Sequence, residues 1–181
     1  VGAIEHAHED EALIYFRGTA DASYADRADR CRRHVLFVKE QQYLVLVDEF
    51  VAKRGMASAL QWNIHSWGAF ETDGERAFWT ERGNSTLYGH VMHNRAGFFS
   101  LAEGWDPPPM RGKDSAQWLQ QYHLRFTPNG IEVPKRNLGV VLCWDHAGWS
   151  KPAVETHLHG DTEVAQVGDD LVLVNGGTGI S

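Results

Sequence analysis

The chain has 181 residues, of which 43% are hydrophobic, so it is long enough to bury a real core and is not a disordered segment. The formal net charge is −7, and the sequence has no basic patch of the kind with which nucleic-acid-binding domains contact phosphates. No apolar run approaches the ~20 residues that a membrane-spanning helix needs. We therefore expect neither a nucleic-acid partner nor a membrane.

Both ends of the sequence resemble cuts in a longer chain. It begins at Val1 rather than at a methionine, carries no signal peptide, and ends in the glycine-rich segment 176–181. We expect residues 1–181 to form a single domain of that longer chain, whose destination the missing signal does not reveal. Cys31 and Cys143 do not fix the redox compartment, because either a disulfide or two buried thiols would fit.

Short apolar runs separated by turn residues dominate the chain, and helical periodicity is scarce. The first run is Ala12–Arg17, and a polar stretch from Gly18 to Arg30 follows it. Next come His34–Val38 and Tyr43–Val47, two β-branched and aromatic runs on either side of a turn at Lys39–Gln42. This composition and spacing predict strands.

The runs on either side of that turn are predicted to pair as an antiparallel hairpin. Centring the turn on Glu40 and Gln41 places Arg33 directly opposite Asp48. Opposed side chains lie close enough to interact, so we predict a structural ion pair that fixes the register of the hairpin. Both faces of the hairpin are apolar, which predicts cover on two sides, as in stacked sheets.

The rest of the chain has the same character. Further strands are predicted at Ala59–Ser66, Ala77–Thr80, Ser85–Met92, Gly97–Leu101, Tyr122–Phe126, Leu138–Trp144, Val154–His159, Glu163–Val167 and Asp170–Val174. Turns are indicated at Asp73-Gly74, Asn129-Gly130 and Gly168-Asp169, and Lys113–Gln121 is the one segment that suits a short helix. Together these patterns predict an all-β fold, an antiparallel β-sandwich of the supersandwich kind with at most one short helix.

One region of the sequence resembles a known family. Tyr15–Tyr24 contains a Gly-Thr-Ala-Asp-Ala turn with a nearby tyrosine, Arg33–Val38 is an apolar strand led by arginine, and Tyr43–Asp48 is a second strand that ends in aspartate. This order resembles the C-terminal region of the heparinase II/III-like polysaccharide lyases, and Trp62–Ser66 is similar to that family's next strand. The resemblance covers roughly Ile14 to Trp67, about a third of the chain.

The resemblance implies a two-part enzyme in which an N-terminal α-helical toroid packs on a C-terminal β-sandwich. It implies β-elimination at a uronic acid of an acidic polysaccharide, and a periplasmic or secreted location. In such a reaction a base removes the C5 proton, an acid assists the departing 4-O-linked sugar, and a third group stabilises the charge on the carboxylate. The toroid of the same chain and the acidic polysaccharide are therefore the expected partners.

No catalytic or metal-binding residue is expected within this chain. In the family the catalytic residues lie mostly on the toroid, and a further histidine with metal ligands precedes the turn matched here. His6 and His8 echo that motif, but they lie too close to Arg33 for the intervening strands, so no role is assigned to them. A divalent metal such as zinc would have its ligands elsewhere in the longer chain, and His157 with His159 is a weak second metal pattern.

The candidate substrate-binding residues are His65, Trp67 and Trp105. His65 lies in a predicted strand between tryptophans and can line a cleft, although a histidine satisfied inside a core or an interface has the same pattern. The tryptophans can stack on sugar rings or fill a core. Two other functions stay open: a non-catalytic carbohydrate-binding β-sandwich, which the seven tryptophans favour, and a purely structural domain that stabilises the toroid.

Overall fold

The protein is described by a computed structural model over residues 2–55, 61–92, 97–104, 120–129, 135–146, 148–159, 162–175 and 179–180. Within these ranges it is built from three antiparallel sheets and one short 3-10 turn, η1 (Asp21–Tyr24). The predicted all-β fold is therefore confirmed. No helix in these ranges is long and apolar enough to cross a membrane.

The largest sheet has eight strands in the order β1-β2-β3-β4-β11-β8-β7-β6. Their bounds are β1 Ala3–Glu9, β2 Leu13–Thr19, β3 Ala28–Val38, β4 Tyr43–Ala52, β6 Phe70–Asp73, β7 Ala77–Arg82, β8 Ser85–Met92 and β11 Lys135–Asp145. A three-stranded sheet has the order β5-β10-β9, with β5 Trp62–Ser66, β9 Gly97–Glu103 and β10 Tyr122–Pro128. A four-stranded sheet runs β12-β13-β14-β15, with β12 Val154–His159, β13 Thr162–Val167, β14 Asp170–Asn175 and β15 Gly179–Ile180.

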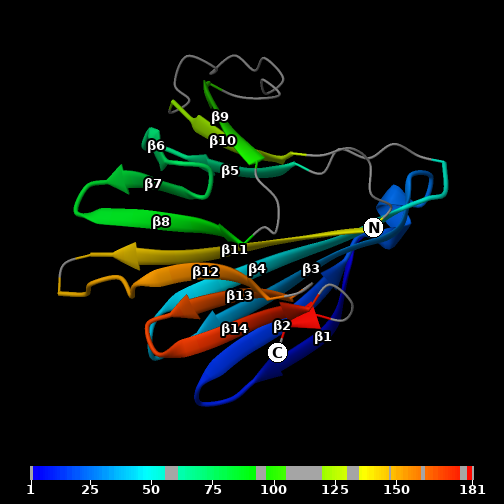
Figure 1. The fold of residues 1–181 in the computed structure, drawn as a ribbon, viewed down its shortest axis with the longest axis horizontal. Helices are drawn as coiled ribbons and strands as arrows, with labels where there is room; N and C mark the ends of the chain where they lie inside the picture. Colours follow the sequence, from blue (N-terminus) through cyan, green and yellow to red (C-terminus); the bar gives the residue numbers. More distant parts are fainter. Residues whose placement is uncertain are drawn as a thin grey trace, which may run out of the picture.

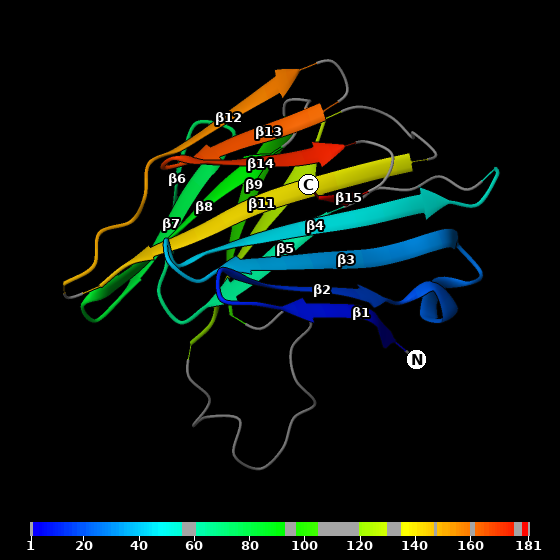
Figure 2. The same cartoon turned by 90° about the horizontal axis from the view of Figure 1, so that it is seen from below.

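The three sheets form three layers. The eight-stranded sheet is the middle layer, the three-stranded sheet covers one of its faces, and the four-stranded sheet covers the other (Figure 1). The middle sheet curls, so that β6 comes beside the three-stranded sheet (Figures 1 and 2). Strands β1 and β2 lie at the opposite edge of the middle sheet, and every residue of β1 is exposed.

Strand β4 shows how the sequence specifies cover on two sides. Successive side chains of a strand point to opposite faces. Tyr43, Val45 and Val47 are buried in a core between this strand and the four-stranded sheet. That sheet contributes Ala165, Val167, Val172 and Val174 to the core. Leu44 and Leu46 face the other way, onto a second core formed with the three-stranded sheet and the curled end of the middle sheet. The prediction that both faces of this hairpin are covered is confirmed.

The predicted hairpin is formed by β3 and β4 in the predicted register, with Val35 opposite Leu46 and Phe37 opposite Leu44. The turn occupies Lys39–Gln42. The turns predicted at Asp73-Gly74 and Gly168-Asp169 are also present, and both glycines have the positive φ that such turns require, 63° at Gly74 and 59° at Gly168.

Some segments differ from the sequence-based expectation. Strands β1, β6 and β15 were not predicted. Strand β5 begins at Trp62 rather than at residue 59, and residues 59 and 60 lie outside the described ranges. A short helix was expected over Lys113–Gln121. Residues 113–119 lie outside the described ranges, and residues 120–121 are not helical. The short 3-10 turn η1 lies instead within the stretch interpreted as a polar connection.

Candidate functional site

Arg33 and Asp48 form a bidentate ion pair where β3 and β4 lie side by side. They are directly opposed in the register, with Arg33 Nε at 2.6 Å from Asp48 Oδ1 and Nη2 at 2.7 Å from Oδ2. The hydrogen bond to the Asp48 carboxylate raises the pKa of the Arg33 guanidinium. Two parallel hydrogen bonds fix both planar groups, because this geometry matches guanidinium to carboxylate.

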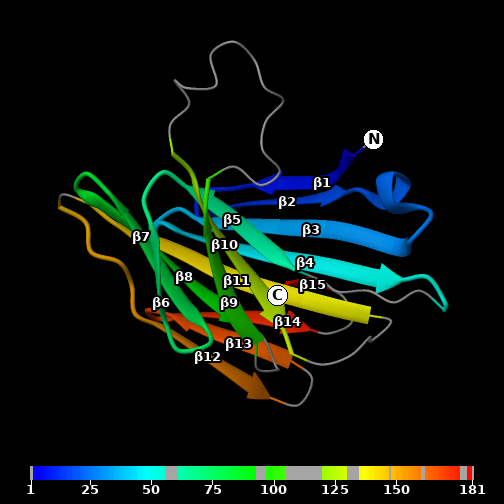
Figure 3. The ribbon, with the colours of Figure 1, turned by 90° about the horizontal axis from the view of Figure 1, so that it is seen from above.

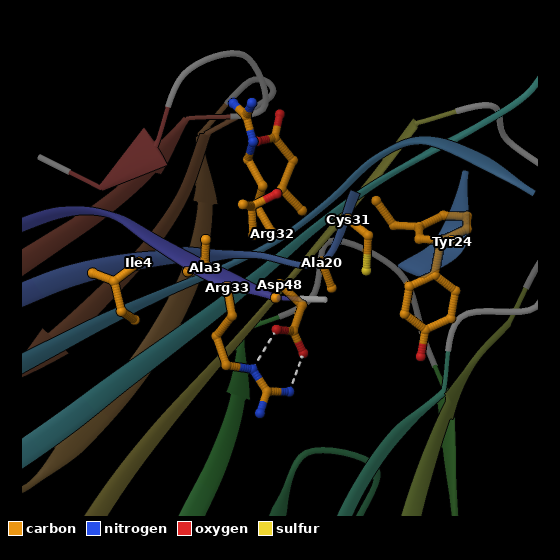
Figure 4. Close-up of a pocket in the computed structure, with 13 residues that line it drawn as sticks. Ala3, Ile4, Ala20, Tyr24, Cys31, Arg32, Arg33 and Asp48 are labelled. Carbon is orange, nitrogen blue, oxygen red and sulfur yellow. Dashed lines mark hydrogen bonds and ion pairs between the residues drawn. The ribbon is translucent and has the colours of Figure 1, made fainter. Parts of the chain in front are cut away.

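The pair lies in a hollow of about 580 Å³ at the edge of the middle sheet (Figure 4). Ile4 of β1, Tyr24 of η1 and Cys31 of β3 also line it. Arg33 and Asp48 point to the same side of the sheet, whereas Arg32 extends to the opposite side (Figure 4). The two charges of the pair compensate each other, and the other lining residues, Ile4 and Tyr24 among them, make the surface of the hollow mainly apolar.

A second set of ion pairs links the strands from β1 to β4. Its residues on β3 and β4 alternate along the strands with Arg33 and Asp48. It consists of Arg17 with Glu5 at 3.0 Å, Arg32 with Glu5 at 3.4 Å and with Asp21 at 3.5 Å, and Arg30 with Glu49 at 2.7 Å. Asp21 also accepts a hydrogen bond from the backbone N–H of Cys31 at 2.6 Å, which holds η1 against β3. Within this set every arginine faces a carboxylate, so it is a structural network rather than a binding site for an anion.

The candidate residue His65 lies on the outer face of the three-stranded sheet. It is directly opposite His123 of β10, and their ring centroids are 4.0 Å apart with the planes at 52°. Its Nδ1 atom is 3.4 Å from the side-chain oxygen of Gln121. His65 is exposed, so it is not a core histidine; sequence analysis missed His123 because that residue is 58 positions further along the chain.

Trp67 follows β5 and is 50% exposed, so it does not fill a core. The Arg82 guanidinium lies over its ring at 3.9 Å from the ring centroid, which is a cation–π contact. His65, Trp67, Arg82 and Gln121 line a hollow of about 370 Å³. The structure thus brings His65 and Trp67 together, whereas Trp105 lies outside the described residues.

The backbone around Trp67 is anchored to β7. The Gly68 N–H donates to the Ser66 hydroxyl at 3.0 Å, the Ser66 and Thr80 hydroxyls are 3.0 Å apart, and the Thr80 hydroxyl donates to the Gly68 carbonyl at 3.0 Å. A Cβ atom at position 68 would lie 2.0 Å from the carbonyl oxygen of Glu81, so only glycine allows this close approach. The anchoring holds Trp67 in one place on the surface.

Neither cysteine has the surroundings of a reactive thiol. Both are free; Cys31 lies in the hollow beside Arg33, and Cys143 is buried in the core on the other face of the middle sheet. Burial raises the pKa of both thiols, so neither is ionised at neutral pH. The alternative of two free thiols is the one observed.

No group of three or more histidine, cysteine, aspartate or glutamate side chains within the described ranges could hold a metal ion. The His6 ring lies 5.7 Å from the Tyr15 ring, between ring centroids, with the planes tilted by 54°, and His8 pairs with Asp10 at 3.1 Å. His157 lies 3.5 Å from Glu155 on the exposed strand β12. His6, His8 and His157 thus each have a partner close by in the sequence or on the neighbouring strand.

The fold is shared with heparinases. A mutant heparan sulfate lyase HepC from Pedobacter heparinus superposes with a TM-score of 0.65 at 13% identity, over 96% of this chain and 27% of that one. A crystal structure of heparinase III gives 0.60 at 12% identity, over 96% of this chain and 27% of that one. A second heparinase III structure gives a TM-score of 0.61 at 14% identity, over 95% of this chain and 27% of that one.

These likenesses concern the fold. No protein-family model matches the sequence, and a search of curated proteins gives no match. The chain spans about a quarter of the length of the lyases that it superposes on. The fold that the sequence resemblance implied is confirmed: the chain has a heparinase-like β-domain fold.

Proposed function

We propose that this chain is the C-terminal β-sandwich domain of a heparinase II/III-like polysaccharide lyase and that residues 1–181 form one domain of it. The observation that carries this is the superposition on heparan sulfate lyases over 96% of the chain, which nevertheless spans only 27% of their length. The order of Tyr15–Tyr24, Arg33–Val38 and Tyr43–Asp48 along the sequence supports the same assignment. The longer chain supplies a helical toroid.

The proposed reaction is β-elimination at a uronic acid. A base takes the C5 proton, the electron pair forms the C4=C5 double bond, and the C4–O bond breaks as an acid protonates the leaving sugar. These groups, and the ligands of any divalent metal, belong to the rest of the longer chain. The domain forms one wall of the cleft and is inactive alone. The longer protein is periplasmic or secreted, where it meets acidic polysaccharide.

His65 and Trp67 are the residues that we assign to this wall. Trp67 offers a half-exposed ring on which a sugar can stack, and His65 adds a hydrogen-bonding group in the same hollow. Arg82, stacked on Trp67, supplies a positive charge where the substrate carries carboxylates. Trp105 remains a candidate by sequence alone.

The test is to express the chain by itself and together with its upstream coding sequence, and to incubate both proteins with heparan sulfate, heparin and alginate. The ultraviolet absorbance of the unsaturated uronate product reports elimination directly. We expect product from the longer protein and none from the 181-residue chain. A longer protein that leaves every uronate polymer intact would contradict the proposed reaction, and turnover by the chain alone would contradict the placement of the catalytic groups.

A further inference from the structure

Strand β1 forms an uncovered edge of the middle sheet. Figure 3 shows it as the last described strand on that side, and each of its seven residues is exposed. Among the described strands it pairs only with β2, so the backbone N–H and C=O groups along its other side have no strand partner there. The opposite edge of the same sheet, β6, has only four residues and comes beside the three-stranded sheet. A longer bare edge is a surface that can accept a further strand.

The two carboxylates of β1 are engaged away from its free edge. Glu5 pairs with Arg17 at 3.0 Å, and Glu9 pairs with Lys39 at 2.8 Å. These partners belong to β2 and to the turn after β3, so both carboxylates reach back over the sheet. The pairing with β2 has a register shift near the start of β1 but is unbroken over His6–Glu9. The free edge therefore has a regular backbone with which another strand can pair.

The hollow beside this edge comes from one row of residues across four strands. Ile4, Gly18, Arg33 and Asp48 are directly opposed in turn from β1 to β4, so they share one face of the sheet. Gly18 has no side chain, which leaves a gap between Ile4 and the Arg33–Asp48 pair. A Cβ atom at position 18 would lie 3.7 Å from Cδ1 of Ile4, an ordinary van der Waals distance. Contacts within this chain thus do not require glycine at position 18.

Exposed apolar side chains border this gap. Ile4 is 64% exposed and Tyr24 is 46% exposed, and Figure 4 shows them at the two ends of the hollow with the Arg33–Asp48 pair between them. The ring of Phe50 also lines the hollow, whose volume is about 580 Å³. Removing such apolar surface from water is favourable. The hollow is therefore suited to apolar side chains supplied by another segment.

The place of this chain in the proposed longer protein indicates which segment that is. The chain spans 27% of the heparan sulfate lyase on which it superposes, so most of a protein of that length lies outside it. Gly2 and Ala3 line the hollow, so a segment that precedes them passes its rim. The middle sheet takes β1, β2, β3 and β4 in chain order, each antiparallel to its neighbour. A preceding strand added at the free edge would continue this order.

We propose that in the longer protein the segment immediately before Val1 pairs as an antiparallel strand with the free edge of β1 and places apolar side chains in the hollow between Ile4 and Tyr24. Backbone groups of β1 supply the hydrogen bonds, as in other cases of strand addition, and Gly18 supplies the room. The inference rests on the proposed function only for the existence of the longer protein. It goes further in assigning a partner to this surface.

The test is hydrogen exchange, followed by mass spectrometry, of the 181-residue chain and of the longer protein. We expect the backbone amides of β1 to exchange at least tenfold more slowly in the longer protein, because pairing protects them. The segment before Val1 should be protected as well. The Cys31 thiol reports on the hollow that it lines: its alkylation at alkaline pH should be at least tenfold slower in the longer protein, whereas Cys143, which is buried, should stay unreactive in both.

Two variants of the longer protein locate the contact. Ile4→Asp places a charge against the apolar side chains, and Gly18→Val fills the gap. Each should return the exchange of β1 and the alkylation of Cys31 to the rates of the same variant of the chain. Leu171→Asp is the matched control, because Leu171 is also 64% exposed but lies on the four-stranded sheet, and it should keep both protections. In the 181-residue chain Ile4 is exposed and position 18 has room, so neither variant should lower the urea midpoint.

Four results would overturn the inference. They are equal exchange of β1 in the two proteins, protection of β1 while the segment before Val1 exchanges freely, full protection in both Ile4→Asp and Gly18→Val, and a dimer of the 181-residue chain that protects β1 to the same extent, which would make a second copy the occupant. Failure of the proposed function looks different. In that case the longer protein forms no unsaturated product, while β1 and Cys31 are still protected in it.

Discussion

The Tyr15 hydroxyl lies 2.9 Å from Nδ1 of His34, and this contact joins β2 to β3 beneath the exposed strand β1. His34 is only 3% exposed. Burial lowers the pKa of its imidazole, since a charged ring would lose its hydration there. A neutral His34 can accept the hydrogen bond from Tyr15, whereas an imidazolium cannot accept it at Nδ1.

Acid should therefore weaken the fold through His34. In the unfolded chain a histidine titrates at about pH 6.5. The folded state holds His34 neutral to a lower pH, because burial lowers its pKa. The unfolded state consequently binds more protons as the pH falls below ~6.5, so the free energy of unfolding decreases by up to about 1.4 kcal/mol per pH unit for this group. Above that pH the contribution is constant.

The measurement is urea unfolding of the chain and of His34→Gln at several values between pH 7.5 and 5. We expect the stability of His34→Gln to vary less with pH over this range, although His90, whose pKa burial also lowers, leaves some dependence in both proteins. An identical slope for the two proteins would show that His34 does not carry the effect.

The Arg33–Asp48 pair should contribute a measurable coupling. The Asp48 side chain is 18% exposed and both hydrogen bonds are short, but Arg33 is 52% exposed, so solvent screening limits the gain. A double-mutant cycle with Arg33→Gln and Asp48→Asn should give about 0.5–1 kcal/mol. The same cycle on Arg27 and Asp26, whose side chains are 76% and 77% exposed, should give a coupling near zero. Equal coupling free energies in the two cycles would contradict the claim that the Arg33–Asp48 pair helps to fix the register of the hairpin.

Gly89 of β8 should not tolerate a side chain. A Cβ atom there would lie 1.9 Å from the ring of Phe78, which is 1% exposed and sits in the core under the three-stranded sheet. Gly89→Ala should therefore lower the free energy of unfolding by about 1–3 kcal/mol through overpacking. Adding Phe78→Leu to Gly89→Ala should restore part of the loss, whereas Phe78→Leu alone should destabilise. A neutral Gly89→Ala would mean that the two strands pack differently.

Tyr43 should contribute to the docking of the four-stranded sheet. Its hydroxyl donates to Asp170 Oδ2 at 3.1 Å, across the buried interface between β4 and β14, and burial is the main cause of its raised pKa. Tyr43→Phe keeps the ring but removes the hydrogen bond, so we expect a loss of about 0.5–1.5 kcal/mol. The matching change Tyr24→Phe, at an exposed tyrosine, should leave the urea midpoint unchanged. A larger loss at Tyr24 would contradict this assignment.

The sequence predicted the structure best where the local residue pattern agrees with the burial of the strand in the folded protein. The β3–β4 hairpin could be predicted with its register because both strands are apolar on two faces and a pair of opposite charges closes the ladder. Strand β1 could not, because Ala3–Glu9 lacks the alternation of apolar and polar residues that predicts a half-buried strand. It is wholly exposed and is extended because it pairs with β2. Strand β6 has only four residues, too few for a pattern.

The candidate site could be predicted only in part from the sequence, for a related reason. His65 and Trp67 stood out by residue type within one strand. Their neighbours His123 and Arg125 come from a strand about 60 positions away, and strand pairing at that distance leaves no local signal. The alternation of Gln61, Asn63, His65 and Trp67 within β5 was the one available indication that this face is polar and exposed.

The central claim is that this domain forms part of the substrate-binding wall of a lyase, and steady-state kinetics of the longer protein test it most directly. His65→Gln and Trp67→Ala should raise KM for acidic polysaccharide several-fold and leave kcat nearly unchanged, because they remove binding that is the same in the ground and transition states. Arg27→Gln should change neither constant. Unchanged KM in both site variants would contradict the claim and leave the domain a purely structural role.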